Sequence, residues 1–181
     1  MAYTIGISGG SASGKSTFAE QLQAALPNSK LITMDSYYKP EEELPLAVSP
    51  INGKTYRDYN HPDSLNLAQC AKDLAKIKVS SKYQVILIEG LFVLQDQAVF
   101  DQLDSKLFID CPADVRIVRR LRRNMAWGLS FDEITEVYLN LVRFRHDEFV
   151  EPSKQKADLV LDGTKDMAAI SKLTLASLHK L

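Results

Sequence analysis

The sequence predicts an α/β fold in which helices cover a central parallel β-sheet. Short apolar runs of strand length alternate with longer segments of helical periodicity, the pattern of consecutive β–α units. The run at 85–88 holds four apolar residues in succession, as expected of a strand buried on both faces. The chain has 181 residues, 45% hydrophobic and 25% charged. This composition is typical of one globular domain over 1–181 and excludes a disordered chain.

The expected elements follow in order along the chain. Strands are expected at the short apolar runs, which are 3–8, 31–34, 85–88, 106–109 and 159–161. Helices are expected where apolar residues recur every three to four positions, which are 15–26, 65–77, 113–125, 131–150 and 166–181. Segment 35–62 interrupts the alternation and holds four of the seven prolines. We predict a long substrate-side loop there, and a disordered insertion is the alternative.

Charge and cysteine content exclude several classes of protein. Lys and Arg number 22 and Asp and Glu 23, so the net charge is −1, whereas a dedicated nucleic-acid binder is usually strongly basic. Cys70 and Cys111 are too few for a disulfide scaffold and suggest a reducing compartment. No segment has the features of a targeting signal or the length of a membrane span. We expect a cytoplasmic protein without nucleic-acid or membrane partners, and the sequence is compatible with a homo-oligomer.

A glycine-rich segment follows the first predicted strand and precedes a predicted helix. It matches the phosphate-binding pattern G-x-x-x-x-G-K-[ST] without a mismatch. Glycines let the backbone turn its N–H groups toward phosphate oxygens, and the helix adds the positive end of its dipole. Lys15 is expected to reach the β- and γ-phosphates, and the Ser16 hydroxyl to ligate Mg²⁺. We therefore expect ATP and Mg²⁺ at nine consecutive residues: Gly9, Gly10, Ser11, Ala12, Ser13, Gly14, Lys15, Ser16 and Thr17.

Two acidic residues follow predicted strands of the same sheet. Glu89 comes directly after 85–88, and Asp35 after 31–34. Because the carboxyl ends of parallel strands meet at one edge, both are expected near the phosphate-binding loop. Glu89 is placed to hold Mg²⁺, directly or through water. Asp35 is placed to orient or deprotonate an acceptor hydroxyl, and a turn-capping role is its alternative.

Five of the eight arginines lie between 116 and 123. On a helix, Arg116, Arg119, Arg120 and Arg123 form one continuous face, and Arg122 lies off it. We predict a helical lid at about 116–130 whose guanidinium groups stabilise charge on a transferring phosphoryl group. A solvated basic helix and an RNA-binding patch are the alternatives. Together with the phosphate-binding motif, this predicts a P-loop NTPase three-layer sandwich with a helical lid.

Two aromatic side chains near the predicted lid receive simpler interpretations. Trp127 either packs within the lid or contacts substrate. His146, on the following predicted helix, is expected to be a surface or capping residue.

Six segments carry a family resemblance. Besides the P-loop, they read Met-Asp-Ser-Tyr-Tyr-Lys-Pro at 34–40, Tyr-Asn-His-Pro-Asp at 59–63, Ile-Glu-Gly-Leu at 88–91, an Asp- and Arg-containing run at 110–123, and Phe-Val-Glu-Pro-Ser-Lys with Ala-Asp within 149–158. In this order they resemble the uridine kinase and phosphoribulokinase superfamily of P-loop kinases. The resemblance implies an ATP-dependent kinase that phosphorylates a primary hydroxyl of a small, nucleoside-like acceptor, in the first instance the 5′-hydroxyl of a ribonucleoside.

The same resemblance implies roles for individual residues. Asp35 would take or orient the proton of the acceptor hydroxyl, and Glu89 would serve the metal. Arg116 and Arg119 would lie near the substrate and the transferring phosphate, and with Asp35 and Lys15 they form the expected catalytic set.

The acceptor side of the site is implied by the resemblance as well. Tyr59 would stack near a base or ribose, residue 60 would hydrogen-bond the ribose, and Tyr38 belongs to the same substrate-binding set. The family's ribose-binding Asp is Asn60 in this chain, which alters the available donors and acceptors.

Other departures bear on the acceptor. Only 26 positions separate Asp63 from Glu89, where uridine kinases carry a longer insert that recognises the pyrimidine. The lid reads Asn-Met-Ala-Trp-Gly at 124–128, where uridine kinases place further arginines. The short spacing and Leu-Asp-Gly-Thr-Lys at 161–165 are more similar to nicotinamide riboside kinases. A kinase of that type is therefore one alternative, and a non-catalytic ATP-binding switch protein is the alternative of a different class.

Overall fold

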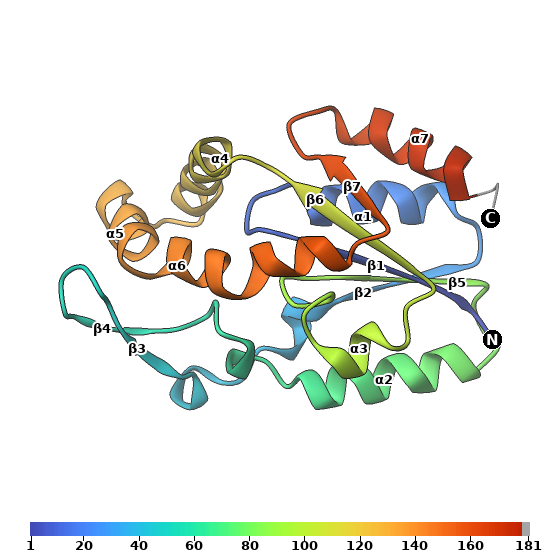
Figure 1. The fold of residues 1–181 in the computed structure, drawn as a ribbon, viewed down its shortest axis with the longest axis horizontal. Coiled ribbons are helices and arrows are strands. Elements are labelled where there is room, and N and C mark those ends of the chain that lie inside the picture. Colours follow the sequence, from blue (N-terminus) through green and yellow to red (C-terminus); the bar gives the residue numbers. More distant parts are fainter. Residues whose placement is uncertain (179–181) are drawn as a thin grey trace.

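The computed structural model describes residues 1–178 and contains a five-stranded parallel sheet between layers of helices (Figure 1). The strand order is β2-β5-β1-β6-β7. The strands are β1 (Tyr3–Gly9), β2 (Ser29–Thr33), β5 (Val85–Glu89), β6 (Ser105–Asp110) and β7 (Leu159–Asp162). All five predicted strands are therefore confirmed within a few residues, and so is the α/β class with a central parallel sheet.

Each face of the sheet has its own apolar core. Successive side chains of a strand point to opposite faces, so the apolar run of β5 contributes to both. On one face, α1 (Lys15–Ala25) and α7 (Met167–Leu178) cover a core that includes Ile5, Ile7, Phe18, Leu22, Leu87 and Ile109. On the other face, α2 (Leu67–Val79) and α3 (Gln97–Phe100) cover a core that includes Leu74, Ile86, Ile88, Phe92, Val99 and Phe108.

The predicted helices are confirmed with small shifts, and α4 (Ala113–Ala126) carries the arginines. The sequence analysis did not predict the four-residue α3. The helix expected at 166–181 is present as α7, and its last three positions, 179–181, lie outside the described residues. Across 1–178, no helix has both the length and the apolar character needed to cross a membrane.

The helix expected at 131–150 is a continuous helical path with two π-helical turns. It consists of α5 (Phe131–Val137), a π turn at Tyr138–Val142, α6 (Arg143–Arg145) and a second π turn at His146–Val150. Ser130 and Glu133 form a capping box at its start, which satisfies free N–H groups of the first turn. Each π turn shifts the following side chains around the helix axis relative to a regular helix.

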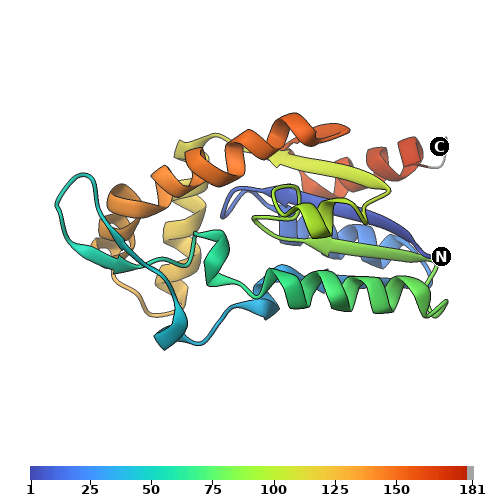
Figure 2. The same cartoon turned by 60° about the horizontal axis from the view of Figure 1, so that its bottom comes forward.

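Segment 35–62 is ordered rather than a disordered insertion. It contains an antiparallel hairpin of β3 (Leu46–Val48) and β4 (Thr55–Arg57) and short 3-10 turns. The hairpin lies beside the helical path that begins with α5 (Figure 2). Ser49 donates a hydrogen bond to Asn140 at 3.0 Å, and Tyr56 donates one to Glu136 at 2.6 Å. A two-stranded hairpin is marginal alone, so these contacts contribute to its order.

Candidate active site

The loop between β1 and α1 has the backbone turns that a phosphate-binding loop requires. Gly9 and Gly14 have φ angles of +152° and +101°, which glycine adopts without a steric penalty. A Cβ atom on Gly9 would stand 2.7 Å from the carbonyl oxygen of Ile109. Gly14 is the N-cap of α1, so the free N–H groups of the first helical turn lie at this loop.

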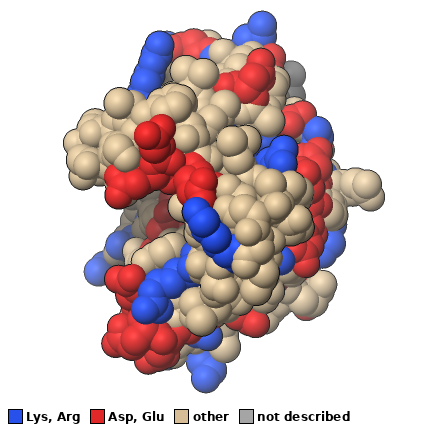
Figure 3. Space-filling model, turned by 90° about the vertical axis from the view of Figure 1, so that its left-hand side faces the viewer, with Lys and Arg blue, Asp and Glu red and all other residues tan. Residues whose placement is uncertain are grey.

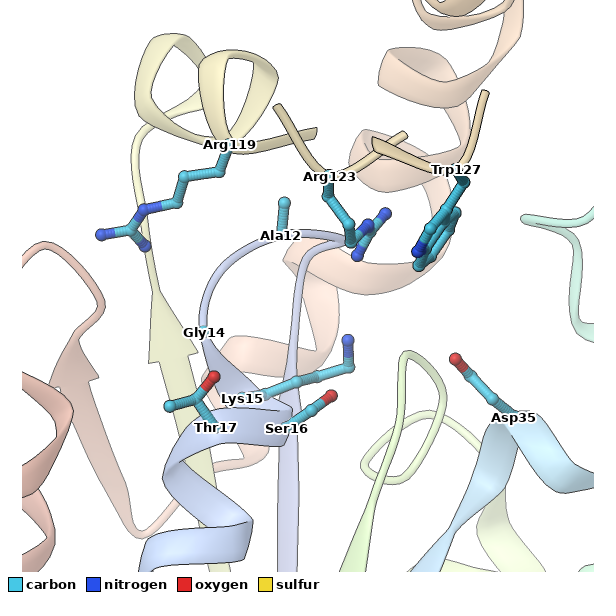
Figure 4. Close-up of a pocket in the computed structure, with 9 residues that line it drawn as sticks. All are labelled: Ala12, Gly14, Lys15, Ser16, Thr17, Asp35, Arg119, Arg123 and Trp127. Atoms are coloured by element: carbon cyan, nitrogen blue, oxygen red, sulfur yellow. The ribbon is translucent and has the colours of Figure 1, made fainter. Parts of the chain in front are cut away.

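A cavity of about 450 Å³ lies over this loop. Lys15 and Ser16 lie below it, Arg123 and Trp127 above it, and Asp35 faces them from the end of β2 (Figure 4). The cavity is lined by Ala12, Gly14, Lys15, Ser16, Thr17, Asp35, Arg119, Arg123 and Trp127. The structure thus brings Asp35 and the core of the P-loop together, as the sequence predicted.

A second cavity of about 240 Å³ adjoins the first. The two share Lys15, Ser16, Asp35, Arg123 and Trp127. The second extends to further residues, all aromatic or polar except Leu91: Ser11, Tyr38, Tyr59, Asn60, Leu91, Arg120 and Asn124. It therefore unites the three residues that the sequence assigned to the acceptor side, and Asn124 and Trp127 are lining residues that the predicted substrate set did not include.

The aromatic side of the second cavity is held by internal contacts. The Tyr38 hydroxyl donates a hydrogen bond to the carbonyl oxygen of Tyr59 at 3.0 Å, and the two rings meet edge to face at 5.9 Å. Burial raises the pKa of the Tyr38 phenol above its usual value, and the neighbouring Asp35 charge raises it further. Tyr38 is therefore a neutral hydrogen-bond donor at physiological pH.

Ser16 and Glu89 fit the requirements of a magnesium site. The Ser16 hydroxyl donates a hydrogen bond to Oε2 of Glu89 at 3.1 Å, and Glu89 is only 2% exposed. Burial raises the pKa of the Glu89 carboxyl, an effect that the Lys15 charge opposes and the Asp35 charge reinforces. Within residues 1–178, no group of three or more His, Cys, Asp or Glu side chains could hold a metal by itself. This suits Mg²⁺, which commonly binds one or two carboxylates together with phosphate oxygens.

Three arginines of α4, which are Arg119, Arg120 and Arg123, donate hydrogen bonds to residues of the P-loop. Arg120 and Arg123 donate hydrogen bonds to the Ser11 hydroxyl at 3.2 and 3.4 Å. Arg119 donates to the backbone carbonyls of Gly163 and Ser13 at 2.8 and 3.3 Å. No arginine of this helix forms an ion pair with any carboxylate among the described residues. Since burial of unpaired charge is costly, this cluster favours an anionic ligand.

Arg116 lies elsewhere, which corrects its expected place beside the substrate. It is 6% exposed, donates from Nε to the carbonyl oxygen of Cys111 at 2.9 Å, and lines neither cavity. Its guanidinium group lies against Gly10 behind the loop. Arg119 lines the first cavity, Arg120 lines the second and Arg123 lines both, and the regular spacing of the four arginines was the signal that could have identified Arg120 and Arg123.

His146 also differs from its expected surface position. Its side chain is 11% exposed, its ring lies against Gly10, and Nε2 is 3.3 Å from a carboxylate oxygen of Glu151. Burial lowers the pKa of His146 below its usual value, and the Arg116 charge lowers it further. No sequence signal indicated this contact, because it joins residues that lie far apart in the sequence.

Comparison with known proteins places the chain in a family. Residues 49–169 match the family described as "Phosphoribulokinase / Uridine kinase family". The uridine kinase of Clostridium botulinum (strain Okra / Type B1) is 32% identical over 203 aligned residues, which cover 98% of this chain and 96% of the relative. The chain belongs to the phosphoribulokinase/uridine kinase family. As a family member it is an ATP-dependent kinase with a hydroxyl acceptor, so the non-catalytic switch is set aside.

Further similarities agree with this assignment. The uridine kinase of Borrelia garinii subsp. bavariensis is 30% identical over 184 residues, which cover 89% of this chain and 86% of the relative. A solved structure from Bacillus stearothermophilus, described as a possible uridine kinase, has a TM-score of 0.62 and 19% identity, with 89% of each chain covered. The crystal structure of TT1252 from Thermus thermophilus has a TM-score of 0.61 and 19% identity, covering 99% and 98%. These structures support the P-loop kinase fold of this family member.

Replacement of Arg123 by Ala should impair this kinase much more than replacement of Arg122. Arg123 lines both cavities without a carboxylate partner, whereas Arg122 is exposed on the opposite side of α4. We expect kcat in a coupled ADP-release assay to fall by about 10²- to 10³-fold for Arg123→Ala, as for other preorganised electrostatic groups. Arg122→Ala should remain within about twofold of wild type. Equal losses in both variants would contradict this assignment.

Replacement of Glu89 by Gln should have two effects. The stability of the nucleotide-free variant relative to wild type should increase as pH rises, and turnover should fall. Burial raises the pKa of Glu89 in the fold, so its ionisation costs stability once the pH exceeds the carboxyl's ordinary value. The Tm of Glu89→Gln relative to wild type should therefore be higher at pH 7 than at pH 4. Turnover with Mg²⁺ should fall by about 10- to 100-fold, as for changes around a bound metal.

Thermal unfolding without ATP and Mg²⁺ measures the first effect, and ADP release measures the second. A relative Tm that declines between pH 4 and pH 7 would show instead that ionised Glu89 stabilises the fold.

Proposed function

We propose that this chain is a ribonucleoside kinase, which transfers the γ-phosphoryl group of ATP to the 5′-hydroxyl of a ribonucleoside. The observation that carries the proposal is the continuity of the two cavities. The cavity with Tyr59 and Asn60 opens directly onto Asp35 and Lys15 beside the phosphate-binding loop. A riboside in the second cavity would therefore have its hydroxyl next to the phosphates in the first. The name uridine kinase, carried by relatives 32% identical over nearly the whole chain, supports a nucleoside acceptor.

The donor side would work mainly by charge and position. Lys15 would bind the β- and γ-phosphate oxygens, and the P-loop N–H groups would hold the remaining phosphate oxygens. Ser16 and Glu89 would hold Mg²⁺, which when bound neutralises charge between the phosphates. Arg120 and Arg123 would stabilise the negative charge that spreads over the transferring group.

The acceptor side would orient one hydroxyl toward that group. Asp35 is exposed at the junction of the two cavities, where its carboxylate would accept the proton of the acceptor hydroxyl. Tyr59 would contact the base or ribose face, and Asn60 would hydrogen-bond the ribose. The phosphoryl group would pass directly and in line to the hydroxyl, and a lid at about 116–130 would exclude water.

A riboside with a ring other than a pyrimidine is the second candidate. The alignment with the uridine kinase of Clostridium botulinum is 203 positions long, longer than this chain of 181 residues, so this chain has gaps relative to it. The short spacing from Asp63 to Glu89 agrees with the loss of a base-recognition insert. A nicotinamide-type riboside would be such an acceptor.

The cellular setting is proposed on simpler grounds. We infer that residues 1–181 form a single kinase domain. We also infer that it acts in the cytoplasm, because Cys70 and Cys111 are both free and buried, as expected in a reducing compartment. The partner is a small-molecule acceptor rather than a nucleic acid, since the net charge is −1.

A coupled ADP-release screen tests the proposal. The panel contains uridine, cytidine, nicotinamide riboside, pantothenate and simple sugars, each with ATP and Mg²⁺. The proposal requires that one or more ribosides be phosphorylated with a far higher kcat/KM than the other acceptors. Turnover confined to pantothenate or a sugar would overturn it, and the ranking among the ribosides separates the two candidates.

Replacement of Asp35 by Asn should lower kcat and leave ATP binding nearly unchanged. The amide keeps the shape of the side chain but cannot accept the hydroxyl proton, so kcat should fall by about 10²- to 10⁴-fold. Glu41→Gln, an exposed change on the same segment, is the matched control and should retain activity. A comparable loss of ATP affinity in Asp35→Asn would assign Asp35 to the metal instead.

Replacement of Asn60 by Asp should strengthen binding of a ribonucleoside. The new carboxylate would accept charge-assisted hydrogen bonds from the two ribose hydroxyls, which should improve acceptor binding by about 1 kcal/mol. A 2′-deoxy analogue should gain less, and the KM for ATP should not change. If the substitution leaves the acceptor KM unchanged for ribosides and for deoxyribosides alike, Asn60 does not face a ribose.

A further inference from the structure

A buried carboxylate lies directly behind the acceptor cavity. Asp58 is fully buried, although it immediately precedes two residues that line the cavity, Tyr59 and Asn60. Its Oδ2 accepts a hydrogen bond from Nε of Arg145 at 2.6 Å, and its Oδ1 accepts one from the backbone N–H of Asn60 at 2.9 Å. Its own N–H donates to the carbonyl oxygen of Pro45 at 2.8 Å. Both carboxylate oxygens are therefore committed, and one of them fixes the backbone of Asn60.

Arg145 connects this carboxylate to the helical path on the lid side. It comes from α6, its side chain is 22% exposed, and it also pairs with Glu148 one turn later. Its guanidinium group lies 5.7 Å from the ring centre of Phe149, and the Phe149 ring meets His61 edge to face at 4.8 Å. Segment 58–61 is thus attached at both ends to residues 145–149.

We infer that Asp58 and Arg145 form a positioning pair that holds Tyr59 and Asn60 in the acceptor cavity. Neither member of the pair lines a cavity, so the pair sets the affinity for the acceptor without touching it. The inference rests on the proposed function in one respect, namely that the second cavity binds the acceptor.

The physical reason is that a buried carboxylate needs hydrogen-bond donors in fixed positions. A carboxylate removed from water is stable only with its hydrogen-bonding partners in place. Asp58 therefore restricts the local backbone to conformations in which Arg145 and the Asn60 N–H reach it together. The side chains of Tyr59 and Asn60 then project into the cavity from a fixed backbone, which lowers the ordering cost of acceptor binding.

Other contacts make this pair separable from the general attachment of the loop. The hairpin is independently held by the hydrogen bonds of Ser49 with Asn140 and of Tyr56 with Glu136. Loss of the Asp58–Arg145 pair should therefore loosen segment 58–61 and leave the hairpin in place. The hydrogen bonds of Asp58 and Arg145 do not involve the P-loop. The ATP site should therefore stay intact when this pair is lost.

Steady-state kinetics of Asp58→Asn and Arg145→Ala test the inference. Each variant should raise the KM for the acceptor by about tenfold or more, the range of coupling between directly contacting groups. The KM for ATP should remain within about twofold of wild type, which also reports correct folding. The double variant should lose little more than either single variant, because the two residues act as one unit. Arg145→Lys keeps the charge and should recover part of the acceptor affinity.

Arg57→Ala supplies the matched control. Arg57 lies next to Asp58 and forms an exposed ion pair with Glu41, and exposed pairs contribute little. This variant should retain both KM values. A rise in its acceptor KM equal to that of Asp58→Asn would show that any lost charge in the loop has the same effect, and would overturn the inference.

Hydrogen–deuterium exchange supplies a readout that does not depend on activity. In Asp58→Asn, peptides that contain residues 58–61 should exchange faster than in wild type, while peptides of the P-loop and of the hairpin should not change. Unchanged exchange at 58–61, or a parallel rise of both KM values, would overturn the positioning role.

The same experiments separate this inference from the proposed function. If wild type phosphorylates no riboside, the proposed function fails, and the acceptor that wild type does phosphorylate then serves for the KM comparison. If ribosides are phosphorylated and the variants keep a normal acceptor KM, the positioning role alone is wrong.

Discussion

The structure depends on positive charge that converges on the loop between β1 and α1 and that, within residues 1–178, forms no ion pair with a carboxylate. Lys15 is 8% exposed, and Arg119, Arg120 and Arg123 reach the same loop from α4, where they donate to hydroxyl, carbonyl and thiol groups. Seen from the end that carries the hairpin, the surface is hollowed, and charged side chains of both signs surround the hollow (Figure 3). Burial disfavours charge without a partner, so a polyphosphate anion would complete the site.

The topology of the sheet explains why two acidic residues, Glu89 and Asp35, lie beside the P-loop. In the register of the parallel sheet, Ile7 pairs with Glu89 and Thr33 pairs with the same residue from the other side. Glu89 is therefore the last residue of β5, level with the end of β2, and the P-loop and the short turn that carries Asp35 follow β1 and β2 at the same edge of the sheet. The placement of Glu89 and Asp35 beside the P-loop follows from strand order alone, before any contact of the lid is considered.

The sequence predicted those parts of the fold that local pattern decides. Strand positions, the P-loop and Asp35 follow from apolar runs, glycine spacing and the shared edge of a parallel sheet. Which arginines line the cavities depends instead on how α4 is rotated against the loop, which involves tertiary contacts such as the hydrogen bond from Arg119 to the carbonyl oxygen of Gly163. The short strands β3 and β4 lack a local signal, because hydrogen bonds to the helical path contribute to their order. The contact of His146 with Gly10 has no local signal either, because it joins residues that lie far apart in the sequence.

The helical path at 131–150 contacts both the donor side and the acceptor side of the site. It follows α4 along the chain, and it also holds the acceptor-side segment through Asn140, Glu136 and Arg145. The His146 ring, in the second π turn, lies against the P-loop at Gly10. One continuous element thus contacts the donor loop, the acceptor loop and the arginine helix. The two sides are contacted by different residues, Arg145 at the acceptor loop and His146 at the P-loop. The same helical path therefore supports both sides of the site, while a change at Arg145 acts on the acceptor side alone.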